Sequence, residues 1–346
     1  MLFDYYNSEN GKVYDNRYDA VYDKYHNNEM VYFYYRDEEY DKINWKIEPS
    51  ENLAQLYKER AQQIRDTYDY VVLCYSGGID STNVLESFYY NNIHIDEIVS
   101  VGSFSQDTTK DIDLNHNKDI YDNVATSLNA FHLPNTKKSF IDYTTYFNDL
   151  NNFSLYKEYN AEYYKYIGAY PSVTYLFWYD LPKFLNLKRN SIIIYGIEKP
   201  FIQRDEFGKF FVQFSDSSIK GYSKYNISGI HRTNFYSDPE SEKILRKQFH
   251  TIINHYNHQE YKENYLNPET YTDTIHKLIY DLKNPLRFIS KKGTNVFFSG
   301  RDKFLKYKQN SDIYNFYGKA MKHMVDNYSL NFNSKYNLYT KKYYFI

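Results

Sequence analysis

The sequence predicts an α/β protein in which a parallel sheet carries helices on both faces. Two observations predict this class. Short apolar runs alternate with helical patterns, which is typical of parallel strands joined by crossover helices. The runs cover residues 70–75, 96–105, 138–143 and 191–196. The first run ends in Ser76-Gly77-Gly78 before a new helical pattern. Ligands of parallel sheets bind at the carboxyl ends of strands, so this turn is the first candidate site.

The elements before the turn comprise one strand and one helix. Residues 29–36 predict a strand within an N-terminal extension, residues 1–49. Residues 49–69 predict a helix, for which we expect Ser50 as the N-cap and Glu51 in the first turn. Its apolar residues fall on one face, which is typical of a helix packed on a sheet. They are Leu53, Leu56, Tyr57, Ala61 and Ile64.

The elements after the turn continue the alternation. The next helix has an apolar face of Val84, Leu85 and Phe88. Residues 110–131 and 171–185 predict two further helices. The inner face of the first is Ile120, Val124, Leu128 and Phe131, and Pro182 is expected to kink the second.

The pattern changes after residue 200. Residues 205–216 predict a hairpin around Phe207-Gly208, and Asp238-Pro239 opens a mainly helical region. We therefore expect three parts: the extension 1–49, a sheet domain 50–205, and a hairpin and helical lobe 206–346 that packs on it.

Composition excludes several classes of site and partner. The 346-residue chain has one cysteine, Cys74, too few for an internal disulfide, a multi-cysteine zinc site or an iron–sulfur cluster. We expect Cys74 to be an unreactive residue of a buried strand. The net charge of −2 does not favour nucleic acid or a membrane surface. With no apolar leader or spanning run, we expect a cytoplasmic protein. The Tyr, Asn, Lys and Ile bias is typical of an AT-rich genome such as that of a phage.

The turn has the chemistry of a phosphate site. Backbone N–H groups at a helix N-terminus attract anions, and glycine lets a phosphate approach closely. The hydroxyls of Ser76, Ser81 and Thr82 are candidate donors to phosphate oxygens. Asp80 would repel phosphate unless Mg²⁺ lies between them, so it is the candidate metal ligand. The lysine of a G-x-x-x-x-G-K-S/T loop is absent.

The string Ser76-Gly77-Gly78-Ile79-Asp80-Ser81 resembles the signature of the PP-loop ATP pyrophosphatases. That family includes asparagine, GMP, NAD and β-lactam synthetases and tRNA-lysidine synthetase. The resemblance implies a Rossmann-like fold of the adenine nucleotide alpha-hydrolase type, with ATP and Mg²⁺ as ligands. The family binds adenine at the end of the second strand, which here is Val101, Gly102 and Ser103.

Residues 170–200 resemble the asparagine-synthetase branch, in which a Pro-Ser helix leads to a strand and an acidic, glycine-rich loop. Here that loop reads GIEKP in place of the usual GEGADE. The resemblance implies that Gly196 passes close to the nucleotide. It also implies that Glu198 shares Mg²⁺ with Asp80 and that Lys199 contacts a phosphate.

A basic segment follows at residues 283–308, with eight Lys and Arg and one Asp. It is either a solvated face or a phosphate or nucleic-acid surface. In the same branch a late lysine contacts the pyrophosphate, and Lys291 and Lys292 are the best positional matches.

The resemblance implies an AMP-forming ligase. A substrate oxygen would attack the α-phosphorus of ATP, pyrophosphate would leave, and an amine would then displace AMP. Asparagine synthetases begin with a glutaminase cysteine, whereas residue 2 here is Leu2, so we expect no glutamine-derived ammonia from this chain. The expected acceptor is a small molecule or a nucleotide. Two alternatives remain: a non-catalytic nucleotide-binding module, and an enzyme that modifies a base in tRNA or phage DNA.

Overall fold

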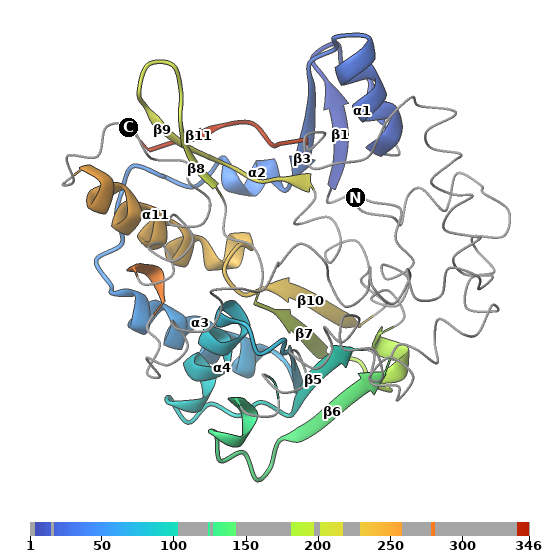
Figure 1. Ribbon diagram of the computed structural model, residues 1–346, viewed down its shortest axis with the longest axis vertical. Coiled ribbons are helices and arrows are strands. Elements are labelled where there is room, and N and C mark those ends of the chain that lie inside the picture. Colours follow the sequence, from blue (N-terminus) through green and yellow to red (C-terminus); the bar gives the residue numbers. More distant parts are fainter. Residues whose placement is uncertain are drawn as a thin grey trace, which may run out of the picture.

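The protein combines one parallel sheet with two small antiparallel sheets, which lie at the other end of the molecule (Figure 1). The computed structural model describes residues 4–14, 17–102, 124, 127–142, 181–196, 201–216, 229–257, 278–280 and 338–345. Within these ranges, no helix has both the length and the apolar character that a membrane crossing needs.

The parallel sheet has five strands and confirms the α/β prediction. In spatial order they are β10 (Ile230–Asn234), β7 (Ser191–Tyr195), β4 (Tyr70–Cys74), β5 (Glu97–Gly102) and β6 (Lys137–Asp142). Every neighbouring pair is parallel. Chain order runs outward from β4 through β5 to β6, and then from β7 to β10 on the other side. The order of the strands therefore reverses between β4 and β7, where ligands of such sheets commonly bind.

Two helices cover one face of this sheet, namely α3 (Leu53–Thr67) and α4 (Ile79–Tyr89) (Figure 1). Their predicted inner faces are confirmed, with Leu53 only partly buried. The predicted cap is wrong, because Asn52 caps α3 and its side chain accepts from the Gln55 N–H at 2.8 Å. Ser50 lies two residues before this cap and bonds to Glu51 instead, and Glu51 pairs with Lys243.

The antiparallel sheets share a second core with three helices. One sheet has the order β2 (Val13–Tyr14), β1 (Asp4–Ser8), β3 (Val31–Tyr35). In the chain, α1 (Arg17–His26) lies between β2 and β3, and α2 (Asp37–Tyr40) follows β3. The other has the order β11 (Tyr343–Tyr344), β9 (Phe210–Gln213), β8 (Phe201–Arg204). The predicted hairpin is confirmed as β8–β9, and Gly208 takes a positive φ of 77° at its turn.

Helix α11 (Glu242–Asn257) follows a short 3-10 helix, Pro239–Ser241, and separates the two cores. Ile244 and Ile252 pack in the core of the parallel sheet. Leu245, Phe249 and Ile253 pack in the core of the antiparallel sheets.

The expected boundary between residues 205 and 206 does not match this arrangement. It would divide the β8–β9 hairpin, and it would separate β10 from its partner β7. Strand β10 was not predicted.

The remaining sequence predictions are covered only in part. Val124, Leu128 and Phe131 are buried in the sheet core as predicted, whereas Ile120 lies outside the described residues. Of the helix expected at 171–185, residues 181–184 are helical and include Pro182. The basic segment 283–308 also lies outside the described residues.

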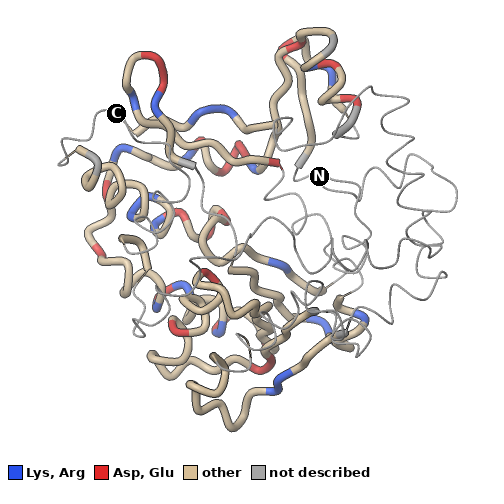
Figure 2. Tube along the Cα trace, in the orientation of Figure 1, with Lys and Arg blue, Asp and Glu red and all other residues tan. Residues whose placement is uncertain are grey.

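Along the described trace, acidic and basic residues are interspersed (Figure 2).

Candidate functional site

The candidate site begins where the chain leaves β4. Tyr75 still belongs to the sheet, because its N–H donates to the Val99 carbonyl at 2.8 Å. The Tyr75 carbonyl accepts from the Ser100 hydroxyl at 2.7 Å. The chain then turns through Gly77, whose φ of +71° favours glycine. Gly78 is the N-cap of α4, so a strand, a glycine turn and a helix follow one another as predicted.

Two serines hold the shape of this turn. Ser81 is buried, and its Oγ accepts from the Ser76 N–H at 3.3 Å and donates to the Gly78 carbonyl at 3.2 Å. The Ser76 Oγ lies 3.2 Å from the Ser81 Oγ and accepts from the Gly78 N–H at 3.3 Å. Ser76 is exposed. Ser81 therefore stabilises the turn from its buried side, while the Ser76 hydroxyl lies at the surface.

Thr82 does not take the predicted position. It is completely buried, and its Oγ1 lies 3.1 Å from the Tyr75 hydroxyl. The same phenol donates to the Ser127 Oγ at 2.7 Å. In this conformation the Thr82 hydroxyl is not available to a phosphate, and its contacts stabilise the packing beneath the turn.

The first turn of α4 supplies donors and a carboxylate. The Thr82 N–H makes an intrahelical bond to the Gly78 carbonyl at 3.0 Å. The N–H groups that precede it have no acceptor within the helix, and together they give its N-terminus a partial positive charge. Asp80 lies in this turn and is half-buried. An anion and a cation can therefore be held within one helical turn.

Two tyrosines that the sequence did not single out bond to Asp80. The Tyr280 hydroxyl donates to the Asp80 Oδ1, and the Tyr236 hydroxyl donates to the Asp80 carbonyl at 2.8 Å. Burial raises the pKa of both phenols well above the usual value of 10, and the nearby Asp80 charge raises it further. Both phenols therefore stay protonated donors at neutral pH.

Gly196 brings the end of β7 against the first turn of α4. A Cβ at this position would lie 2.8 Å from the Ser81 Cα and 2.9 Å from the Ser81 nitrogen. Because these are backbone atoms, a side chain has no room. The structure gives this glycine a packing role beside the loop, and its predicted approach to a nucleotide stays a prediction. Glu198 and Lys199 follow Gly196 in the chain and lie outside the described residues.

The end of β5 forms the third predicted part of the site. Cys74 pairs with Val99, so Val101 lies level with Ser76 at the same edge of the sheet. Val101 and Gly102 pair with Ile141 and Asp142 of β6. The strand ends that carry Ser76, Gly196 and Val101 thus meet at one edge. Ser103, Lys291 and Lys292 lie outside the described residues.

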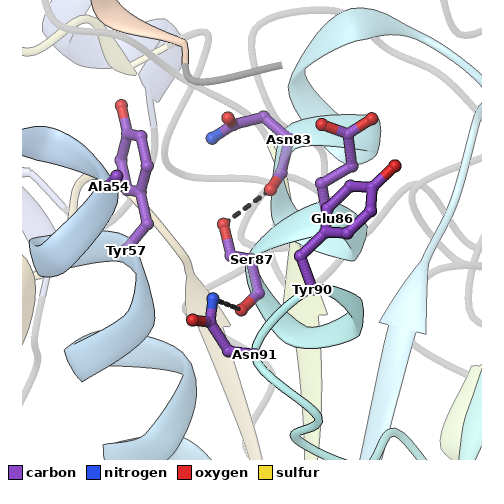
Figure 3. Close-up of a pocket in the computed structure, with 7 residues that line it drawn as sticks. All are labelled: Ala54, Tyr57, Asn83, Glu86, Ser87, Tyr90 and Asn91. Carbon is purple, nitrogen blue, oxygen red and sulfur yellow. Dashed lines mark hydrogen bonds between the residues drawn. The ribbon is translucent and has the colours of Figure 1, made fainter. Parts of the chain in front are cut away.

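A cavity of about 180 Å³ lies away from the loop, between α3 and α4 (Figure 3). Its lining is Ala54, Tyr57, Asn83, Glu86, Ser87, Tyr90 and Asn91. Asn83 connects it to the site, because its amide donates to the Tyr236 hydroxyl at 2.9 Å. The turn after β4 is the better candidate site, because it combines backbone donors, a hydroxyl and a carboxylate.

Cys74 ends β4, immediately before this turn. Burial raises the pKa of its thiol from the usual 9 to about 12. A thiol of this kind is unreactive at neutral pH, which agrees with the inert role expected from the sequence.

No group of three or more His, Cys, Asp or Glu gathers as a metal site within the described part of the chain.

Comparison with known proteins adds no relative: no protein-family model matches the sequence, and no curated protein is significantly similar to it.

Proposed function

We propose that this protein is an ATP-dependent, AMP-forming ligase of the PP-loop type, with the Rossmann-like fold of the adenine nucleotide alpha-hydrolases. One observation carries the proposal. The Ser76-Gly77-Gly78 turn lies where the strand order reverses and leads into a helix whose first turn holds Asp80. Nucleotide phosphates bind at such positions in open parallel sheets. Gly196 supports the assignment, because it keeps a second strand end beside the same helical turn.

The site fits Mg²⁺ bound together with ATP rather than by the protein alone. Mg²⁺ commonly uses one or two carboxylates plus substrate phosphates. Asp80 is the one carboxylate in the first turn of α4. A carboxylate beside phosphates is favourable only when a cation lies between them. Asp80 would therefore hold the metal, and Glu198 is the proposed second ligand. The metal would neutralise charge on the phosphates.

The chain's own groups would bind the phosphates and stabilise pyrophosphate as it leaves. The helix N–H groups and the Ser76 hydroxyl are neutral donors directed at the loop. Lys199, Lys291 and Lys292 are the proposed cationic contacts. Adenine would lie against the ends of β5, at Val101, Gly102 and Ser103. Such preorganised donors stabilise charge that develops in the transition state.

The proposed reaction joins two substrates that the protein positions. An oxygen of the acceptor attacks the α-phosphorus, and the bond to the β-phosphate oxygen breaks. An amine then attacks the carbon that carries the adenylated oxygen, the bond between them breaks, and AMP leaves with that oxygen. Positioning is the main contribution of the protein, since the attacking groups belong to the substrates.

The test is product analysis with α-labelled ATP and Mg²⁺, with host-cell extract as the source of acceptor and amine. We expect AMP and pyrophosphate as the enzyme-dependent products. The Gly77→Val, Gly78→Val double variant should lose both ATP binding and turnover. The matched control is Gly208→Val, which also replaces a glycine of positive φ but in the distant hairpin. ADP as the main product would contradict the mechanism. ATP binding without turnover in any extract would favour a non-catalytic nucleotide-binding module.

Asp80→Asn tests the metal assignment separately. The side chain is half-buried, so the unfolding free energy of the ligand-free protein should change by about 1 kcal/mol or less. The Mg²⁺-dependent part of ATP affinity should disappear, because an amide oxygen carries no charge. Calorimetric titration with ATP, in Mg²⁺ and in EDTA, measures this part. Equal Mg²⁺ dependence in the variant and the parent would contradict the assignment.

A further inference from the structure

We infer that Tyr280 is a positioning residue that fixes the Asp80 carboxylate for the metal ion. The inference rests on the proposed function and extends the site to a segment 200 residues away in the chain. The Tyr280 hydroxyl donates to the Asp80 Oδ1, and its ring is buried. A carboxylate near the protein surface has several rotamers, and this bond selects one of them. Metal binding through the second oxygen is compatible with it.

A chain of buried hydrogen bonds holds Tyr280 in place. The Tyr57 hydroxyl, on α3, donates to the carbonyl of Ile279, the residue before Tyr280. Gln248, on α11, donates from its Nε2 to the Tyr57 hydroxyl at 2.9 Å. Tyr57, Gln248 and Ile279 are all buried. Helices α3 and α11 therefore set the position of the Tyr280 phenol through these bonds.

Tyr236 also bonds to Asp80, but to its main chain, whereas Tyr280 bonds to its side chain. Its hydroxyl donates to the Asp80 carbonyl at 2.8 Å and accepts from the Asn83 amide at 2.9 Å. The rings of Tyr236 and Tyr280 also pack together, with centroids 5.6 Å apart. The two phenols thus hold Asp80 at two different atoms, and only Tyr280 bonds to the carboxylate. Tyr236 also bonds to the Tyr280 side chain, so it reaches the carboxylate only through Tyr280.

A phenol suits this role because it orients the carboxylate without neutralising it. A protonated phenol adds no positive charge that would compete with a cation. Carboxylates that bind metals are commonly hydrogen-bonded by outer groups, and loss of such a group typically costs about 10–100-fold in metal affinity. We expect a loss in this range when the Tyr280 hydroxyl is removed.

The test is Tyr280→Phe, which keeps the ring against Tyr236. ATP binding is measured by calorimetry across a Mg²⁺ series and in EDTA. We expect the Mg²⁺ concentration at half-maximal effect to rise about 10–100-fold, while ATP affinity in EDTA stays unchanged. Tyr236→Phe should move the Mg²⁺ midpoint less than Tyr280→Phe does, because its phenol bonds to the Tyr280 side chain and not to the carboxylate. A purely structural role for Tyr280 would instead lower ATP affinity equally in Mg²⁺ and EDTA.

A second variant covers the case in which Tyr280→Phe does not fold. Tyr57→Phe leaves Asp80 and Tyr280 intact but releases the Ile279 carbonyl, and it should raise the Mg²⁺ midpoint by about 3–10-fold. If Tyr280→Phe and Tyr57→Phe fold and leave the Mg²⁺ midpoint unchanged, the inference about Tyr280 is overturned and the proposed function is not. Absence of any Mg²⁺-dependent ATP binding by the unmodified protein overturns the proposed function, and the inference with it.

Discussion

The two cores of this protein are built from different kinds of side chain. Aliphatic residues dominate the strands of the parallel-sheet core, for example Leu73, Ile192 and Ile194. Aromatic residues dominate the core of the antiparallel sheets, which includes Tyr6, Phe33, Tyr35, Tyr40, Trp45, Phe214 and Phe249. An aliphatic side chain contributes through burial and shape alone, whereas a buried tyrosine must also bond its hydroxyl.

The buried phenols therefore connect segments that are far apart in the chain. Tyr35 donates to the Asp238 carboxylate at 3.0 Å, and Tyr6 donates to Asp216 at 3.1 Å. Tyr40 donates to the Ser237 carbonyl. Ser237 and Asp238, which accept the bonds of Tyr40 and Tyr35, follow β10 closely in the chain. Strand β3 and helix α2 are thus bonded to the segment that follows the edge strand of the parallel sheet. The comparison indicates that polar contacts of buried phenols help to fix the aromatic core and join it to the first.

The largest expected effect concerns α11, which both cores share. Phe249 is buried against Trp45 and Phe345, and Phe249→Ala should lower the unfolding free energy by about 3–5 kcal/mol. Since the helix also packs in the other core, both should unfold in one transition. Circular dichroism and Trp45 fluorescence, in a Trp178→Phe background, should give the same shifted midpoint in denaturant. Phe207→Ala is the control, because Phe207 is 79% exposed, and it should change stability by less than about 0.5 kcal/mol. Two separate transitions would show that the cores are independent.

The next effect compares a glycine from each region. Gly196→Ala places a Cβ within 3.0 Å of the α4 backbone, so it should cost about 1–3 kcal/mol and weaken ATP binding. At Gly208 nothing lies within 4 Å, and only the positive φ opposes a side chain. Gly208→Ala should therefore cost about 1 kcal/mol and leave ATP binding unchanged. Denaturant titration and calorimetry measure the two quantities. Equal loss of ATP binding in both variants would contradict a local role for Gly196.

A smaller effect tests the polar contacts of the aromatic core. Tyr40→Phe leaves the buried Ser237 carbonyl without the phenol that donates to it, and should cost about 1–2 kcal/mol. Tyr32→Phe removes an exposed bond to Glu9, 3.1 Å long, and should cost less than about 0.5 kcal/mol. Thermal or denaturant unfolding of the two variants measures the difference. If the Tyr40→Phe and Tyr32→Phe variants were equally stable, ring packing alone would hold this core.

The same contrast explains how far the sequence predicted the fold. Strands β4, β5 and β7 are short apolar runs, and such runs are visible in a sequence because buried parallel strands lack polar positions. Strand β10 reads IHRTN and has one aliphatic residue, so no apolar signal marks it. Two of its polar residues make tertiary contacts. Arg60 donates to the Thr233 Oγ1 at 2.8 Å, and the Asn234 N–H donates to Asp238 at 3.0 Å.

The candidate site was predictable to a similar extent. The turn at Ser76, Gly77 and Gly78 follows from local residue types, because glycine and serine have defined roles between a strand and a helix. Tyr280 is one of 44 tyrosines, and its bond to Asp80 joins residues 200 positions apart. Local pattern carries no information about such a contact. The burial of Thr82 was missed for a related reason, since its partner Tyr75 precedes the turn and belongs to the sheet.

The smallest expected effect uses Cys74, the one cysteine, as a reporter of the parallel sheet. Its thiol pKa is raised by burial to about 12, so at pH 8 only about one molecule in 10⁴ of the folded protein carries a thiolate. Alkylation by iodoacetamide should be roughly 1,000-fold slower than that of an unfolded chain, whose thiol titrates near its usual value. The sign follows from the higher pKa in the folded state. Between pH 9 and about 12 the unfolded chain loses its proton first, so stability falls as pH rises through this window.

The Cys74 rate also tests whether the two cores open together. Trp45 fluorescence reports the aromatic core, whereas alkylation of Cys74 at pH 8 reports exposure of β4, next to the candidate site. Because α11 packs in both cores, the alkylation rate and the fluorescence should change at the same denaturant concentration. Fast alkylation while Trp45 fluorescence stays native would show that the parallel sheet opens first. The buried phenols of Tyr35 and Tyr40 would then stabilise their own core without holding the strand that leads to the loop.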